Sequence, residues 1–164
     1  MKQRNNIIFL AISVLCVLWI TLICRTPDAS RSVFTDPFWT FAGQKHWQKF
    51  LLNGMLFVPL GYFSFVEFKR MRSKWLCVLM LIITFSALIE TAQFITNLGT
   101  WDIDDIISNT LGGNFGLVFA FIIDKLKEDA GNASFNVLLR RGVSLILITA
   151  ELIACFAFRP SPVP

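Results

Sequence analysis

Charged residues are scarce in this 164-residue chain, at 16% of the sequence, whereas 55% of the residues are hydrophobic. This composition excludes a typical soluble domain, which carries more charge and less apolar surface. Catalytic and metal-binding signatures are also lacking, because there is one histidine, no Ser-His-Asp order, no glycine-rich phosphate loop and no metal-ligand spacing. We expect the four cysteines to act as small apolar side chains and not as a disulfide framework.

Five apolar segments are near or above the length that crosses a bilayer, which is about 20 helical residues for a hydrocarbon core about 30 Å thick. They cover residues 7–24, 50–66, 75–95, 103–123 and 143–158. We predict an all-α fold, a polytopic membrane protein with a bundle of about five transmembrane helices, and a single membrane domain over residues 1–164. The first segment has no small-residue cleavage site, so we expect a retained helix and not a signal peptide.

Lysine and arginine in short loops mark the cytoplasmic side of a membrane protein. With the N-terminus inside, the inner side holds Lys2, Arg4, Lys69, Arg70, Arg72, Lys74, Lys125, Lys127, Arg140 and Arg141. The outer side then holds only Arg25, Arg31, Lys45, Lys49 and Arg159. We therefore predict a cytoplasmic N-terminus and an extracytoplasmic C-terminus. The basic residues lie in clusters beside the membrane, which favours lipid headgroups and no nucleic acid as partners.

Polar residues follow one another at spacings of three and four in the third and fourth segments, which places each set on one helix face. The third segment carries Ser86, Glu90, Gln93 and Asn97, and the fourth carries Asp102, Asp105, Asn109, Gly112 and Gly116. The short connection over residues 96–102 makes these helices antiparallel neighbours. A polar stripe facing acyl chains is costly, so we expect both stripes to face each other or a shared wet cavity that opens outward.

The candidate polar site comprises Asn53, Glu90, Gln93, Asp102, Asp104, Asp105 and Asn109, all within about 10 Å of the outer ends of their helices by the helical rise. Its candidate basic partners are Lys45, His46 and Lys49. Purely structural roles are the alternative explanation for most of these residues. Asp102 can cap a helix, Asp105 suits a first turn, and the amide side chains can form hydrogen bonds between helices. Those roles leave Glu90 unexplained, since a charge within the membrane needs a proton, a cation or a basic partner. Glu151 has no partner that the sequence identifies.

Three blocks of sequence resemble the VanZ-like family of bacterial membrane proteins. They are residues 53–61 (NGMLFVPLG), 90–94 (ETAQF) and 99–113 (GTWDIDDIISNTLGG). The resemblance covers roughly residues 45–123 and leaves the first and fifth helices outside its recognisable blocks. It implies a multi-pass protein of the bacterial cytoplasmic membrane, whose founding relative is linked to teicoplanin resistance.

Three functions are compatible with these observations. The first is a cell-envelope factor associated with glycopeptide resistance, whose outward-facing polar site meets a lipid headgroup, a lipid-linked wall precursor or the glycopeptide. The second is a membrane-embedded enzyme acting on a lipid headgroup or lipid-linked substrate, with carboxylates as acid and base or as ligands of a hard divalent cation. The third is a small lipid or solute transporter. The residues specify no cofactor, and the catalytic residues and any metal stay open.

Overall fold

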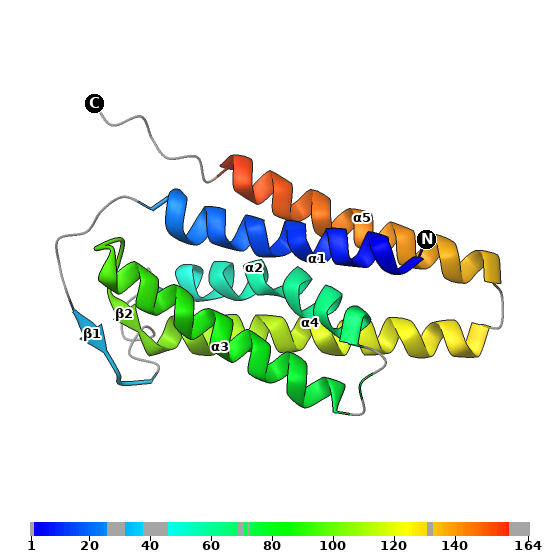
Figure 1. The fold of residues 1–164 in the computed structure, drawn as a ribbon, viewed down its shortest axis with the longest axis horizontal. Coiled ribbons are helices and arrows are strands. Elements are labelled where there is room, and N and C mark those ends of the chain that lie inside the picture. The colour runs from blue at the N-terminus through cyan, green and yellow to red at the C-terminus, as the bar shows by residue number, and fades with distance from the viewer. Residues whose placement is uncertain are drawn as a thin grey trace.

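The structure, a computed structural model, describes residues 2–25, 32–37, 46–68, 71, 73–130 and 133–157. The described helices are α1 (Lys2–Leu18), its π-helical continuation η1 (Trp19–Ile23), α2 (His46–Glu67), α3 (Lys74–Ile95), α4 (Ile103–Ala130) and α5 (Ala133–Ala157). Two short strands, β1 (Val33–Phe34) and β2 (Trp101–Asp102), pair in parallel. The predicted all-α fold with five helices is confirmed (Figure 1).

Four helical stretches are long and apolar enough to cross a membrane, and they are Asn5–Ile23, Trp47–Glu67, Lys74–Ile95 and Ile103–Glu128. Several helices extend beyond the apolar segments, because polar residues at the membrane surface continue a helix once it has begun. Thus α2 starts at His46, α4 continues to Ala130 and α5 starts at Ala133. The fifth helix carries Arg140, Arg141 and Glu151, and its crossing of the bilayer stays a prediction.

The helix α2 packs against all four other helices, and its contact with α4 is the most extensive in the described structure. Figure 1 shows α1 and α5 side by side on one side of the bundle, with α3 on the opposite side. The two strands lie at the end of the bundle where α3 ends and α4 begins (Figure 1). We call this the site end, and the charge count predicts that it faces outside.

Glycines allow the backbones of α2 and α4 to touch. A methyl group added at Gly112 would lie 1.8 Å from the carbonyl oxygen of Gly54, and one at Gly116 would lie 1.9 Å from that of Val58. Likewise, a methyl at Gly61 would lie 2.0 Å from the Gly113 carbonyl oxygen. Small residues that permit close helix packing are typical of membrane bundles. This interface therefore sets the distance between the two helices that carry Asn53 and Asp105.

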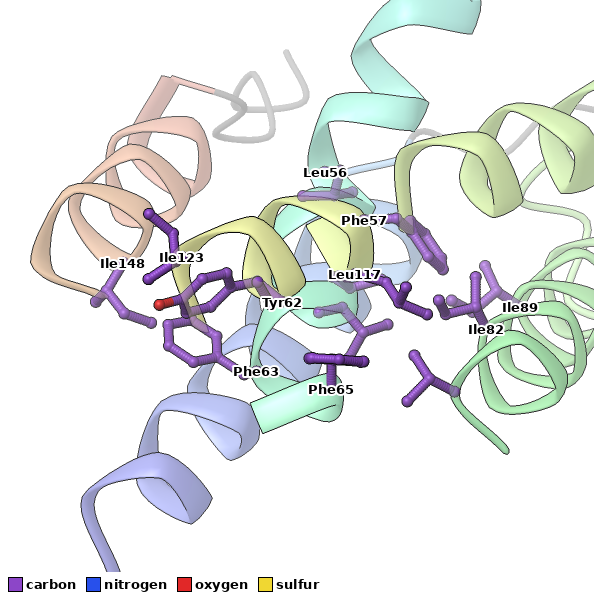
Figure 2. Packing of buried hydrophobic residues seen from close by; sticks show 14 residues of the cluster. Leu56, Phe57, Tyr62, Phe63, Phe65, Ile82, Ile89, Leu117, Ile123 and Ile148 are labelled. Atoms are coloured by element: carbon purple, nitrogen blue, oxygen red, sulfur yellow. The ribbon is translucent and has the colours of Figure 1, made fainter. Parts of the chain in front are cut away.

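The apolar core lies around α2. Figure 2 shows side chains of α2, α3, α4 and α5 meeting there, and its labelled residues are Leu56, Phe57, Tyr62, Phe63, Phe65, Ile82, Ile89, Leu117, Ile123 and Ile148. Large apolar side chains also cover the outside, among them Met55, Leu88 and Phe115, each more than half exposed. An outer surface this apolar is what a lipid-facing bundle requires, since lipid tails and not water then surround it.

Candidate functional site

The turn after α3 reverses the direction of the chain, so that α4 packs against α3. The N–H of Leu98 donates to the carbonyl of Gln93 at 2.8 Å, and that of Asn97 donates to Phe94 at 3.5 Å. Asn97 has φ of 57°, so the turn is a Schellman motif with asparagine in the left-handed position. Asn97 therefore lies beyond the end of α3 and is exposed, which corrects its predicted place on the polar stripe. The chain then enters β2, where the Trp101 N–H donates to the Ser32 carbonyl at 3.1 Å.

Asp102 stands at the start of α4 and meets Glu90 there. Its side-chain Oδ1 accepts from the N–H of Asp104 at 3.0 Å, so it caps the helix. Its own backbone N–H donates to Glu90 Oε2 at 3.2 Å. Glu90 is 1% exposed, and the charged groups that act on it are Asp105, Arg25 and Lys49. The described hydrogen-bond donor to Glu90 is thus a backbone amide, and two cations, Arg25 and Lys49, act on its charge electrostatically.

Asp105 joins α4 to α2 through both of its carboxylate oxygens. Oδ1 accepts from Asn53 Nδ2 at 2.8 Å, and Oδ2 lies 2.9 Å from Lys49 Nζ. Lys49 also lies 3.5 Å from Asp102 Oδ2. Among the candidate basic partners, Lys49 therefore makes ion pairs, whereas Lys45 lies outside the described residues, as does the side chain of His46. Lys49 keeps two buried carboxylates from standing unpaired at the membrane level, where isolated charges are costly.

Arg25 is a site residue that the sequence reasoning missed, because it was counted only toward the orientation. It stands two residues beyond the end of η1, and its Nη2 lies 3.8 Å from Asp105 Oδ2. Its position in the sequence was the available signal. Arg25 is a cation at the end of the first apolar segment, and the charge count assigns it to the same outer side of the membrane as the acidic residues. We define the charged cluster as Arg25, Lys49, Asn53, Glu90, Asp102 and Asp105, contributed by four successive parts of the chain.

Gln93 ties α3 to the end of the first helix. Its Nε2 donates to the backbone carbonyl of Thr21, in η1, at 2.9 Å. The side chain is 0% exposed, and its Oε1 has no hydrogen-bond partner among the described residues. A π-helical turn shifts backbone carbonyls away from their usual α-helical partners, and such turns often occur at functional sites. Gln93 thus belongs to the surroundings of the cluster and anchors the segment that carries Arg25.

Asn109 lies deeper, apart from the direct contacts of the cluster. Its Nδ2 donates to Ser86 Oγ at 2.8 Å, which joins α3 and α4. The polar stripes of α3 and α4 therefore contact each other through the hydrogen bond between Asn109 and Ser86, as their spacing predicts. The stripe on α4 is nevertheless divided, because Gly112 and Gly116 face α2 and not α3. The reason is that α4 packs more extensively on α2 than on its sequence neighbour α3.

Asp104, the remaining predicted site residue, is 1% exposed in the first turn of α4. Its backbone N–H belongs to the cap made by Asp102. Together, Asp102, Asp104 and Asp105 place negative charge at the N-terminus of α4, where the helix dipole favours it. In the part of the chain that the structure describes, no three acidic, histidine or cysteine side chains are grouped as metal ligands. Within the charged cluster, the carboxylates of Glu90, Asp102 and Asp105 are held by backbone amides, an asparagine and two cations.

Another buried carboxyl group, that of Glu151, lies outside the site, between α1 and α5. Ser13 Oγ donates to Glu151 Oε2 at 2.7 Å, and both residues are buried. This answers the open question of the partner of Glu151, which is a hydroxyl group on the first helix. Nearby, Cys155 Sγ lies 4.0 Å from the Cys16 carbonyl oxygen, and the four cysteines are free.

Fold and site together define a polytopic helical membrane protein with a charged cluster buried at one end of its bundle. The VanZ/LLP1 family model matches residues 8–124. The chain therefore belongs to the VanZ/LLP1 family. The match begins within α1, so most of the first helix is part of the family region, whereas α5 lies beyond the match.

Protein VanZ of Enterococcus faecium is 37% identical to this chain over 79 residues. The aligned stretch is 47% of this chain and 47% of that protein, so the chain spans about half the length of this relative. No solved structure matches the chain.

Proposed function

We propose that this protein is a cell-envelope factor that lowers the susceptibility of a bacterium to lipophilic glycopeptides of the teicoplanin type. The similarity to Protein VanZ supports this role. The observation that carries the proposal is the burial of Glu90, Asp102 and Asp105 at one level of the bundle, with Lys49 and Arg25 beside them. Charge held within a membrane is costly to keep and typically marks a functional site.

The cluster would act at the outer surface, because the charge count predicts that the site end faces outside. At that depth it can meet the headgroup region, where lipids, lipid-linked wall precursors and lipophilic glycopeptides are anchored. A cysteine at Thr96, which is exposed after α3, tests the orientation in intact cells. It should react with a membrane-impermeant thiol reagent, while a cysteine at Glu128 stays protected. Reaction at Glu128 alone would place the cluster on the cytoplasmic side.

Resistance is tested by expressing the chain in a susceptible Gram-positive host. We expect the inhibitory concentration of teicoplanin to rise severalfold and that of vancomycin to rise less, because only the lipophilic drug is anchored in the membrane. Membrane expression is confirmed by an epitope tag. An unchanged inhibitory concentration for both drugs, with the tagged protein present in the membrane, would refute the proposed role.

A further inference from the structure

Arg25 offers more hydrogen-bond donors than its described contacts use. A guanidinium has five N–H donors, and the ion pair described for Arg25 is the 3.8 Å contact with Asp105. Asp105 is already held more closely, by Asn53 at 2.8 Å and by Lys49 at 2.9 Å. The Arg25 side chain is also 26% exposed. Arg25 is therefore a cation of the cluster that can accept an anionic partner from outside without leaving Asp105 unpaired.

Gly99 lies next to both the Arg25 guanidinium and the Gln93 side chain. A methyl group built on Gly99 would lie 2.9 Å from Arg25 Nη1 and 3.7 Å from Gln93 Oε1. The same glycine thus adjoins an arginine donor and a fully buried amide oxygen that has no hydrogen-bond partner among the described residues. An unpartnered buried acceptor indicates a missing donor, since leaving it unpaired costs free energy. A ligand with an anionic oxygen and a neighbouring hydroxyl group would satisfy both.

Phosphate is the anion that this position favours. The planar fork of arginine matches the geometry of phosphate oxygens, and headgroup phosphates lie at the level where a transmembrane helix ends. Arg25 stands at that level, two residues beyond the end of η1. Trp47 is half exposed at the start of α2, on the same end of the bundle, as expected of a tryptophan at the membrane interface.

We propose that Arg25 is the contact point for a phosphate group, that Gln93 Oε1 accepts from a hydroxyl group beside that phosphate, and that Gly99 leaves room for the guanidinium. Gln93 also positions Arg25 through its hydrogen bond to Thr21. The proposal names the ligand chemistry of the cluster and rests on the proposed function only in using the same site. Both membrane lipids and free phosphate carry this group.

Thermal unfolding of the full chain in detergent measures this binding, since a ligand of the folded state raises Tm with its concentration. We expect a saturable rise with short-chain phosphatidylglycerol, which has a phosphate and hydroxyl groups, and none with the matching diacylglycerol. Inorganic phosphate alone separates the two sources. An equal rise at the same phosphate concentration assigns the site to the free anion, and a smaller rise assigns it to lipid.

Two variants locate the binding at Arg25. Arg25→Gln should raise the half-saturating concentration at least tenfold. Gly99→Ala should raise it severalfold at normal folded yield, because the methyl group displaces only the flexible end of Arg25. The matched controls are Arg141→Gln, an exposed arginine on α5, and Gly142→Ala, where the added methyl meets nothing within 4 Å.

The proposal is overturned if the wild-type chain shows no saturable rise, if diacylglycerol acts as well as phosphatidylglycerol, or if Arg25→Gln binds as wild type does. Should Arg25→Gln fail to fold, Gly99→Ala decides the question, and an unchanged half-saturating concentration contradicts the proposal. None of these readouts uses drug susceptibility. Phosphate binding without a resistance phenotype would therefore refute the proposed function alone, and resistance without phosphate binding would refute this inference alone.

Discussion

The α2–α4 and α1–α5 interfaces are built in opposite ways. Between α2 and α4, backbone meets backbone at Gly61, Gly112 and Gly116, with no space for one additional methyl group. Between α1 and α5, side chains intervene, and the contact is less extensive. Its buried polar feature is one hydrogen bond from Ser13 to Glu151. The first interface is therefore rigid in its spacing, while the second rests on apolar packing and, among the described residues, on the Ser13–Glu151 hydrogen bond and the weaker contact of Cys155 Sγ with the Cys16 carbonyl.

The charged cluster lies at the interface with the closer backbone contact, between α2 and α4. Asn53 on α2 and Asp105 on α4 can meet at 2.8 Å only while the two backbones stay in contact. The fifth helix contributes no described residue to the cluster and lies beyond the family match. We infer that the α2–α4 interface is the frame of the site, and that α5 supports the bundle from the side of α1.

The largest effect is expected from enlarging the glycines of the frame. Gly112→Ala or Gly116→Ala places a methyl group less than 2 Å from a backbone carbonyl oxygen, so the helices must separate. We expect each to lower the free energy of unfolding by about 3 kcal/mol or more, with a corresponding loss of folded yield in detergent. Gly142→Ala, on α5, is the control, because nothing lies within 4 Å of the added methyl group.

A smaller effect is expected at the other interface. Ser13→Ala removes the hydroxyl group that donates to Glu151, and we expect a loss of about 1 kcal/mol, as measured for hydrogen bonds between membrane helices. Adding Glu151→Leu should recover most of this loss, because replacing both polar partners removes the buried unsatisfied group. Thermal unfolding in detergent checks both variants. A double variant less stable than Ser13→Ala would show that Glu151 has a further stabilising partner.

The helices could be predicted from the sequence because each has a long apolar run. The spacing of polar residues on α3 and α4 also placed Glu90 near Asp102 correctly, since both lie close to one short connection. Three features were beyond that reasoning. The packing of Gly112 and Gly116 on α2 depends on which helix lies nearest, which periodicity does not reveal. The turn at Asn97 requires its left-handed backbone. The contact of Arg25 with Asp105 joins residues separated by almost half of the chain.

The central claim is that the buried charges of the cluster are needed for function and not only for folding. Glu90→Gln and Asp105→Asn test it most directly, because each keeps the shape and most of the hydrogen-bonding capacity of the side chain while removing its negative charge. The measurement is the inhibitory concentration of teicoplanin in the expressing host, together with the amount of folded protein in detergent. Glu128→Gln, at an exposed position on α4, is the control. We predict that both cluster variants fold at near wild-type yield and lose the resistance, whereas Glu128→Gln keeps it. Full resistance in both cluster variants at normal yield would show that the charges are structural and would contradict the assignment of the site.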